Sequence, residues 1–476
     1  MTREPSEIDK IANAWLKKMA DMSPSFATYI GQPGGEDKLD DFSPEAQQQE
    51  ADEARKVLAQ LAAAPVRDKV DEVTLDAMRE DLNLALEFFD AKLYRRNLNV
   101  IASPLQGIRD IFDLSPRATE QDWHNLAARM NGVQGAMDGY LASLQEGIDA
   151  GDAPARRQVE RGIEQAAQIT AASGFFIEFA ASAKAGDADL PESLKAEVIK
   201  AGEAATAAYA AAEDFLKNRL LPAASDVDAI GRERYALFSR RFLGAKVDLD
   251  ETYEWGKQVL AEVTAEQEAV ANEIKPGASV LEAIDALNND ASRKLHGTKA
   301  LQEWMQRLSD TAIEKLAGSH FDIPEPLKRL ECMIAPTKHG GIYYTGPTDD
   351  FSRPGRMWWS VPEGVEEFDT WRETTTVYHE GVPGHHLQVA SQVYNKDELN
   401  SWRRLASWSS GHGEGWALYA ERLMADLGFL NDPGDRLGML DGQRMRAARV
   451  VLDLGVHLGK PTLDGSGIWN FDYALD

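Results

Sequence analysis

Three histidines and a glutamate fall within one short segment of this chain, HEGVPGHH, which runs from His379 to His386. The 476 residues contain only nine histidines, so a third of them lie here. Neutral imidazole is the commonest protein ligand for zinc, and a neighbouring carboxylate suits the general base that a metal-activated water needs. The segment therefore predicts a catalytic zinc centre, against the ordinary alternative of a solvated His-His pair on the surface.

The spacing of these histidines excludes the usual zinc-peptidase helix. In HExxH, two histidines four residues apart share one helix face, but the residue four after His379 is Pro383, which cannot bind metal and interrupts a helix. On an unbroken helix a histidine seven residues on would lie about 10.5 Å along the axis, too far to share one ion. We therefore predict a break at Pro383-Gly384 that brings a second imidazole beside His379. His385 is the preferred second ligand and His386 the alternative, with the remaining ring orienting a ligand or contacting substrate.

A second segment downstream, GHGEGWALYAE over residues 411–421, offers a third ligand. Its apolar spacing predicts a helix that starts near Glu414 and ends at Gly428. Glu414 would lie in the first turn and could project into a cleft. Glu421 lies about two turns further along the same face, which suits a group that supports a ligand from behind. The alternative is that both glutamates are ordinary exposed helix residues.

Together, HEGVPGHHLQ and EGWALYAE resemble the paired signature of a bacterial family known as domain of unknown function 885, whose fold resembles the helical zinc peptidases of the carboxypeptidase Taq family. The resemblance covers most of the chain. It implies that one zinc ion is bound by His379, by His385 or His386, and by Glu414. It also implies that Glu380 is the general base. Zinc peptidases with a lengthened motif keep a glycine before the second ligand, which favours His385.

The resemblance also implies a carboxy-terminal segment that this sequence does not contain. Members of that family usually continue past the position of Asp476 with a helical segment that includes a Pro-Gly-Gln-Ala stretch and a tyrosine. The final residues here, 469–476, carry no helix-terminating signal. We therefore expect part of one wall of the cleft to be missing, which puts the catalytic competence of this chain in question.

The expected reaction is amide hydrolysis without a covalent intermediate. Zinc would lower the pKa of its water toward about 7 and polarise the carbonyl, while Glu380 takes the proton of the water and passes it to the leaving amine. The sole cysteine, Cys332, lies in an apolar run typical of a buried, inert thiol, and no GxSxG or phosphate-loop motif is present. The alternatives are a metal-dependent hydrolase of a non-peptide amide or ester, or a non-catalytic helical binding protein with a structural or vestigial metal site.

Two aromatic segments offer groups that could hold a substrate. Residues 340–344 and 357–361 are rich in β-favouring side chains and predict two short strands or a hairpin. A strand edge of this kind can pair with an extended peptide, although the aromatic residues could equally fill core. Tyr343 and Tyr344 are the side chains that we expect to reach a developing oxyanion.

A further group of polar residues falls on one predicted helix face. Arg446, Arg449, Asp453 and His457 follow one another at spacings of three, four and four residues. A structural stripe of ion pairs is the ordinary explanation. The functional interpretation is that Arg449 or His457 faces the cleft and binds a substrate carboxylate or stabilises the transition state. The resembling family carries an arginine, an aspartate and a histidine in this pattern, so Asp453 is included in the functional interpretation as a residue that supports the site from behind or binds substrate.

The rest of the sequence predicts a mainly α protein, a large multi-helix lobed fold with a central cleft and a small β-hairpin or short sheet near the active site, similar to the zincins. Ser43 is a predicted N-cap, with Pro44 in the first helical position. We expect one helical unit over residues 1–476, with a looser amino-terminal part over 1–230 and the metal-site part over 231–476. Apolar spacing predicts helices over residues 44–63, 70–93, 120–150, 155–185, 194–221 and 249–274.

Charge and composition limit the partners. A net charge of −27 disfavours nucleic acid and anionic membranes. The first residues have no apolar core of a signal peptide, and no apolar run approaches the roughly 18 residues of a membrane span. One cysteine excludes an intrachain disulfide, so the cytoplasm is the expected location, although a removed export signal would leave no trace. The expected partner is a peptide or small amide substrate, and a homodimer stays open.

Overall fold

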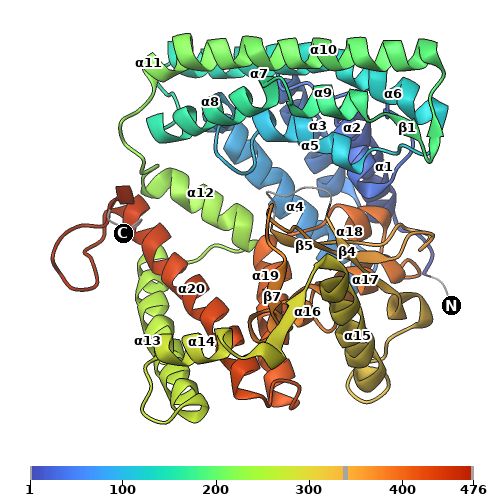
Figure 1. Ribbon diagram of the computed structural model, residues 1–476. Helices are drawn as coiled ribbons and strands as arrows, with labels where there is room; N and C mark the ends of the chain where they lie inside the picture. The colour runs from blue at the N-terminus through green and yellow to red at the C-terminus, as the bar shows by residue number, and fades with distance from the viewer. Residues whose placement is uncertain (1–2, 336–340, 473–476) are drawn as a thin grey trace. The chain divides into compact units, whose positions relative to one another are not determined.

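The computed structural model describes residues 3–335 and 341–472, which are mostly helical with a few short strands (Figure 1). This confirms the predicted mainly α fold. The chain divides into two compact units, Met1–Asp228 with Asn400–Ala406, and Ala229–Leu399 with Ser407–Asp476. The first residue of the predicted strand segment, Gly340, and the end of the chain from Tyr473 lie outside the described residues.

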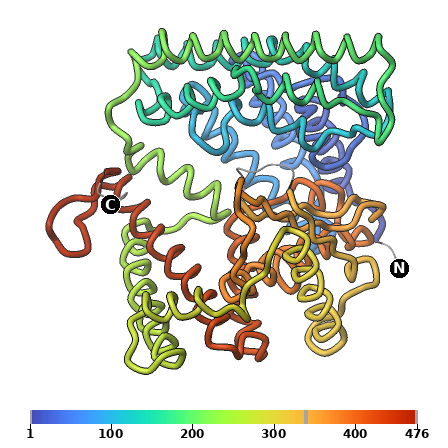
Figure 2. The backbone as a smooth tube through the Cα atoms, viewed as in Figure 1, coloured from blue at the N-terminus to red at the C-terminus, as the bar shows by residue number. Residues whose placement is uncertain are grey.

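The first unit is a helical assembly, and in Figure 2 its residues up to Asp228 are drawn in blue to green and its segment Asn400–Ala406 in orange. One short hairpin interrupts it, formed by β1 (Lys184–Ala185) and β2 (Ala188–Asp189). Turns of other geometry lie at Leu93–Arg96 and Leu216–Leu220. The helices are α1 (Glu7–Met22), α2 (Pro24–Ile30), α3 (Pro44–Ala63), α4 (Lys69–Asp90), α5 (Pro104–Leu114), α6 (Glu120–Asn131), α7 (Val133–Asp149), α8 (Arg156–Thr170), α9 (Phe175–Ala181), α10 (Glu192–Phe215), α11 (Leu221–Ala223) and α18 (Ser401–Leu405).

The long helix α10 organises the larger core of this unit, because it packs on α6, α7, α8 and α9 (Figure 1). Its buried face is lined by small residues at helical spacing, which lets neighbouring helices approach closely. A side chain at Gly202 would place its Cβ 2.8 Å from the carbonyl oxygen of Phe176. The alanine-rich stretch of α10 is therefore a packing face. The buried alanines of this face are Ala201, Ala205, Ala208 and Ala212.

A smaller core joins α1, α3 and α4 to the short helix α18. Trp402 of α18 is buried in this core. Asn400, which caps α18, donates a hydrogen bond of 3.0 Å to the buried carboxylate of Asp9. Asp9 also closes a capping box with Ser6 at the start of α1. These contacts explain why a segment 400 residues into the chain belongs to the first unit.

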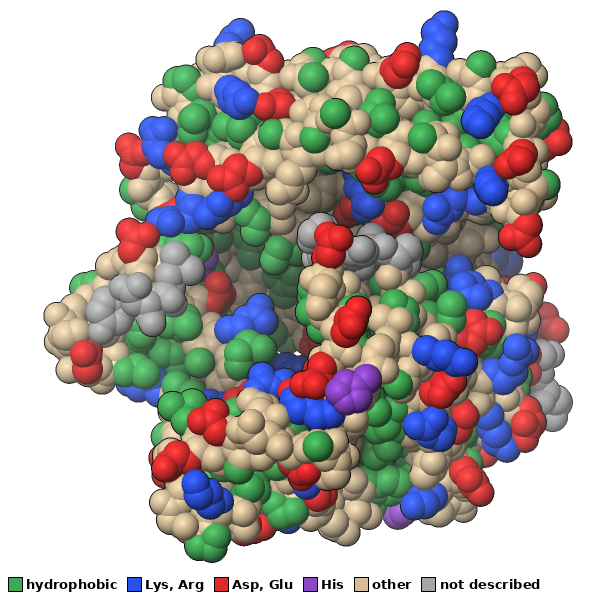
Figure 3. All heavy atoms as spheres, in the orientation of Figure 1, with side chains coloured by type: hydrophobic (Ala, Val, Ile, Leu, Met, Phe, Trp, Pro, Cys, Tyr) green, Lys and Arg blue, Asp and Glu red, His purple; other side chains and the backbone are tan. Residues whose placement is uncertain are grey.

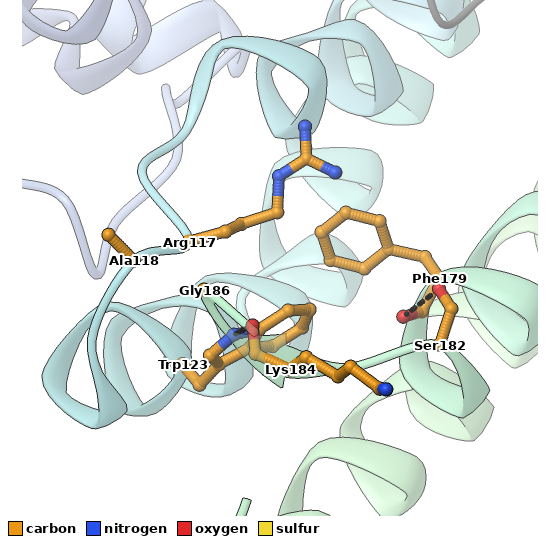
Figure 4. A pocket seen from close by; sticks show the side chains of 7 residues that line it. All are labelled: Arg117, Ala118, Trp123, Phe179, Ser182, Lys184 and Gly186. Atoms are coloured by element: carbon orange, nitrogen blue, oxygen red, sulfur yellow. Dashed lines mark hydrogen bonds between the residues drawn. The ribbon is translucent and has the colours of Figure 1, made fainter. Parts of the chain in front are cut away.

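The surface of the first unit has a hollow of about 520 Å³ at the turn between α5 and α6 and the β1–β2 hairpin (Figure 4). The indole Nε1 of Trp123 donates to the carbonyl oxygen of Lys184 at 2.6 Å. The guanidinium of Arg117 lies 5.4 Å from the ring centre of Phe179. The first contact fixes the hairpin on α6, and the second holds the turn between α5 and α6 against α9.

The second unit contains the predicted metal-site segments. Short 3₁₀ turns lie at Ala291–Arg293 and Glu325–Lys328. Its helices are α12 (Arg232–Leu243), α13 (Leu249–Ile274), α14 (Val280–Asn288), α15 (Thr298–Leu316), α16 (Thr370–Glu380), α17 (His385–Tyr394), α19 (Ser410–Asp426) and α20 (Pro433–Leu458). Its strands are β3 (Lys294–His296), β4 (Leu330–Ile334), β5 (Ile342–Thr345), β6 (Gly355–Trp359) and β7 (Glu367–Asp369).

The strands of the second unit form two small sheets. β5 and β6 pair antiparallel, as the aromatic segments predicted, and β4 adds a parallel strand in the order β4-β6-β5. β3 pairs antiparallel with β7, which leads directly into α16. Cys332 in β4 is buried, and its burial raises the pKa of the thiol to about 11. This environment agrees with the predicted inert thiol.

Helix α16 lies at the centre of the second unit. It packs on α20, α19 and α15, while α13 packs along α20. Trp371 and Val377 of α16 are fully buried in the main core of the unit. The close crossing of α16 and α20 depends on Gly438, where a Cβ would lie 2.2 Å from the carbonyl oxygen of Trp371. The helix that carries the first predicted ligand is therefore fixed on several sides.

The charged side chains of the chain are widely spread. On the face drawn in Figure 3, acidic and basic groups lie interspersed among uncharged ones, without one large patch of either sign. In the described ranges, no helix is long and apolar enough to cross a membrane.

Candidate metal centre

The helix break that the sequence predicts is present, because α16 ends at Glu380 and α17 begins at His385. Two glycines make the intervening turn possible. A Cβ on Gly384 would lie 1.8 Å from the carbonyl oxygen of His379, and one on Gly381 would lie 2.6 Å from that of Val377. Contacts this short are sterically forbidden, so the backbone can fold back only where no side chain is present.

Helix α19 is held against this turn by two hydrogen bonds. The indole Nε1 of Trp416 donates to the carbonyl oxygen of Pro383 at 2.8 Å, and Nε2 of Gln388 donates to that of His412 at 3.3 Å. Ser409 caps the helix by accepting from the backbone N–H of His412. The helix starts one turn earlier than the sequence predicted, and Glu414 near its start faces the turn between α16 and α17.

Three of the predicted ligands come together here. Nε2 of His379 lies 3.3 Å from Oε2 of Glu414, and Nε2 of His385 lies 3.5 Å from Oε1 of the same carboxylate. The two imidazole rings are perpendicular, with centres 4.8 Å apart. The three donor atoms lie within 4.8 Å of one another. Among the described residues, His379, His385 and Glu414 are close enough together to bind one metal ion.

The geometry of this cluster fits a zinc ion. Two ligands that each lie about 2.0–2.1 Å from a tetrahedral ion are roughly 3.3 Å apart. The two separations between histidine and glutamate, each to a different carboxylate oxygen, are close to this value. Two imidazoles and one carboxylate are also a donor set of catalytic zinc sites, which keep the fourth position open. The side chain of Glu414 is 53% exposed, so solvent reaches the cluster from its side.

His386 faces away from the cluster and uses both ring nitrogens elsewhere. Its Nε2 donates to the carbonyl oxygen of Leu327 at 2.7 Å, and its Nδ1 lies 2.9 Å from the hydroxyl of Tyr344. Burial lowers the pKa of His386 to about 4, so the ring is neutral and Nδ1 accepts from the tyrosine. The structure therefore separates the two alternatives that the sequence left open, with His385 in the cluster and His386 as a link between α17, β5 and residue 327.

A buried carboxylate lies directly behind His379. Oε1 of Glu421 accepts from Nδ1 of His379 at 2.7 Å, and Oε2 accepts from the hydroxyl of Thr375 at 3.0 Å. Nη1 of Arg446 lies 3.5 Å from Oε1. Glu421 is fully buried. With a metal ion bound, this hydrogen bond would keep the proton of His379 on Nδ1 and leave Nε2 available as a ligand. Glu421 thus has the supporting position that the sequence predicted for it.

The charged groups of the cluster shift one another's pKa values so that each charged form is stabilised. Burial alone would lower the pKa of His379, but the hydrogen bonds to Glu414 and Glu421 outweigh it and raise the pKa to about 9. The hydrogen bonds from His379 and His385 hold the pKa of Glu414 well below its usual range, against the effect of burial. The carboxylates thus stabilise a positive charge between them, as a bound cation would require.

Glu380, the predicted general base, lies beside the cluster at the end of α16. Its side chain is buried, and its Oε2 has no hydrogen-bond partner among the described residues. Burial raises the pKa of this carboxyl; the positive charges of His379, His385 and Arg446 oppose the rise. An unpaired buried carboxylate oxygen is costly, and a water at the open position of the cluster would satisfy it.

The two tyrosines of β5 lie in different surroundings. The hydroxyl of Tyr344 is bonded to His386, and its ring packs edge-on against that imidazole. Tyr343 is partly exposed, and its ring stacks on Trp358 of β6 with centres 6.2 Å apart. The oxyanion role of either hydroxyl stays a prediction, and for Tyr344 it would require the hydroxyl to leave His386.

The polar residues of the predicted stripe on α20 make contacts in two different regions. Nδ1 of His457 accepts from the backbone N–H of Ile230 at 3.2 Å, and the hydroxyl of Tyr235 donates to Asp453. These contacts join the end of α20 to α12 and the residues before it. Arg449 is exposed. Of the four residues in the stripe, Arg446 is the one whose described contact reaches the carboxylate behind His379.

Sequence reasoning missed two residues of this site. Thr375 lies one helical turn before His379, so the spacing of α16 could have indicated it. Trp408 lies 6.4 Å, centre to centre, from the ring of His385, and no sequence pattern pointed to it.

The fold and the cluster define a mainly helical protein with a His-His-Glu site at a helix break. Over residues 24–476 the sequence matches the family described as "Bacterial protein of unknown function (DUF885)", and the chain belongs to this family. No functionally curated protein matched the sequence.

Two solved structures share the fold. One, described as "the putative lipoprotein from Colwellia psychrerythraea", is 21% identical, with a TM-score of 0.80 over 95% of this chain and 84% of that one. The other, described as "a putative lipoprotein of unknown function from Shewanella oneidensis", is 16% identical, with a TM-score of 0.69 over 96% and 85% of the two chains. At these identities the likeness concerns the fold alone.

Proposed function

We propose that this protein is a zinc-dependent hydrolase of amide bonds in short peptides. The observation that carries the proposal is the convergence of His379, His385 and Glu414 beside the unpaired carboxylate oxygen of Glu380. His379 and His385 are buried, whereas Glu414 is half exposed. A structural zinc site is normally closed by four protein ligands, so three ligands with an exposed side favour catalysis over a structural role.

Each residue has a defined task in the proposed reaction. His379, His385 and Glu414 would hold one zinc ion, which when bound supplies an activated water and a Lewis acid for the carbonyl. Glu380 accepts a proton from the attacking water and returns it to the leaving amine. Glu421 keeps His379 in the required tautomer. Arg446, next to Glu421, adds positive charge close to the site where negative charge develops.

The finer parts of the proposal rest on the resemblance to helical zinc peptidases of the carboxypeptidase Taq type. That resemblance suggests carboxypeptidase-like cleavage of short peptides. A non-peptide amide or ester presents the same carbonyl to the same groups, so a substrate panel has to separate these classes. Sedimentation would test whether the protein forms a homodimer. Cell fractionation would test whether it is cytoplasmic or exported.

The decisive experiment compares Glu380→Gln with the parent protein. We expect both to bind one zinc per chain by elemental analysis, because Glu380 is not a ligand. Hydrolysis of a short-peptide library, followed by mass spectrometry, should fall by about 100-fold or more in the variant. Glu268→Gln, an exposed residue of α13, is the matched control and should cleave like the parent. A parent without bound zinc, or a Glu380→Gln variant as fast as the parent, would refute the proposal.

A further inference from the structure

Trp408 occupies an unusual position beside the candidate metal centre. Trp408 is 54% exposed, whereas Tyr378, a large aromatic residue near the same helix break, is buried. Its ring centre lies 6.4 Å from that of His385, with the planes inclined at 53°. A large apolar ring left half in water is common at binding surfaces, where a ligand completes its burial.

The ring of Trp408 is held in place by α19 itself. A Cβ on Gly413 would lie 2.1 Å from Cη2 of Trp408, so any other residue at position 413 would displace the indole. Glycine inside a helix destabilises the helix relative to alanine. Gly415, two residues on, meets nothing within 4 Å. The glycine at 413 therefore has a specific consequence, which is that the six-membered ring of the indole can lie against the first turn of α19.

This position places the indole next to one of the three donors, the imidazole of His385, and against the residue that precedes a second donor, Glu414. The indole contacts Gly413, which immediately precedes Glu414, and its ring centre lies 6.4 Å from that of His385. Solvent reaches the cluster on the side of Glu414, since the two histidines are buried. A substrate that approaches from solvent with its carbonyl at the cluster therefore brings an adjoining group against Trp408.

We propose that Trp408 forms one wall of a substrate subsite that takes an apolar, preferably aromatic, side chain next to the scissile amide. This inference rests on the proposed function and names the substrate class of that site. The wall offers an aromatic face and no charge of its own, so it selects by apolar contact and ring stacking. Peptides with acidic or small polar side chains at that place are poorer substrates.

The test uses binding of metal-directed inhibitors to the zinc-loaded protein, which does not require turnover. N-acetylphenylalanine hydroxamate and N-acetylglycine hydroxamate carry the same zinc-binding group and differ by one benzyl group. Isothermal titration should show that the parent binds the phenylalanine compound about tenfold more tightly. In Trp408→Ala the ratio should fall to about twofold or less, and Trp408→Phe should restore most of it. Trp255→Ala, at an equally exposed tryptophan of α13 (55%), should keep the parental ratio.

Zinc affinity, measured separately by chelator competition, distinguishes a subsite from a packing role. If Trp408→Ala weakens zinc binding, Trp408→Leu retains an apolar group against Gly413 and should still lower the ratio to about threefold. A parent without benzyl preference, or variants of Trp408 that keep the full preference, would overturn the inference. A parent that binds the hydroxamates with this preference but hydrolyses no peptide would refute the proposed reaction and leave the subsite standing. A parent that binds no zinc would overturn both.

Discussion

His379 and Glu421 form a buried hydrogen bond of 2.7 Å between Nδ1 and Oε1, and this bond connects the His-His-Glu cluster to the core of the second unit. Glu421 is fully buried and is also contacted by Thr375 and Arg446. His379 thus cannot rotate without breaking a bond inside a packed core. The cluster is preorganised by this support, because a histidine that is held from behind presents its other nitrogen in a fixed direction.

We expect Glu421→Gln to weaken zinc binding by about tenfold, and Glu421→Ala by up to about 100-fold. Glutamine keeps a hydrogen-bond acceptor but removes the negative charge behind His379, whereas alanine removes both. Thr375→Val, which deletes the hydroxyl bonded to the other oxygen, should have a smaller effect. Zinc competition with a chelator measures the affinities. Equal affinity in parent and Glu421→Ala would show that Glu421 has no supporting role.

The two adjacent histidines should respond differently to the same substitution. His385→Gln should abolish stoichiometric zinc, since it removes one of the three donors. His386→Gln should keep the zinc but lower the stability of the metal-free protein by about 1–3 kcal/mol, because the carbonyl of Leu327 and the hydroxyl of Tyr344 lose a buried partner. Elemental analysis and thermal unfolding measure the two effects. Loss of zinc in His386→Gln would contradict the arrangement of the cluster.

Local patterns predicted many of the helices but not all of their breaks. The predictions over residues 44–63 and 249–274 match α3 and α13, and Ser43 caps α3 as expected. Their apolar residues recur at helical spacing, which is a local property. The segment 120–150 is two helices that meet at Gly132, where the backbone stays near helical values. Spacing alone does not reveal such a change, because both helices keep apolar residues at similar intervals.

The candidate site shows the same limit. The break before His385 follows from Pro383, because proline cannot continue a helix. The choice between His385 and His386 could not follow from spacing, since it depends on Leu327 and Tyr344, far away in the sequence. Trp408 was missed for a related reason, because its role depends on the missing side chain of Gly413 and on packing of α19. The sequence indicated Arg446 only as one of several polar residues on a predicted helix face.

Gly384 should tolerate no side chain. In Gly384→Ala the Cβ would lie 1.8 Å from the carbonyl oxygen of His379, so the turn between α16 and α17 must open and separate His379 from His385. We expect a loss of about 2–4 kcal/mol in stability and no stoichiometric zinc. Gly415→Ala is the control, because its Cβ meets nothing within 4 Å and alanine favours helix α19. If Gly384→Ala binds zinc like the parent, the break is not needed for the site.

A carboxyl group elsewhere on α16 predicts a pH dependence of stability. Burial raises the pKa of Glu373 to about 7, with Asp369 adding to the rise and Arg372 opposing it. The carboxyl of a glutamate in the unfolded chain has a pKa of about 4.3. Between these values the folded protein holds a proton that the unfolded chain has released, so this group makes stability fall as pH rises through the window.

Glu373→Gln removes this effect, because glutamine carries no titrating proton. We expect the variant to be about 1–2 kcal/mol more stable than the parent at pH 8, less than the full pKa shift would give because the group is partly exposed. At pH 4.5, where Glu373 is protonated in the folded protein, the difference should largely vanish. Thermal unfolding of both proteins with chelator at each pH measures this, and other titrating groups cancel in the comparison. A difference that is the same at both pH values would show that Glu373 does not retain its proton in the folded state.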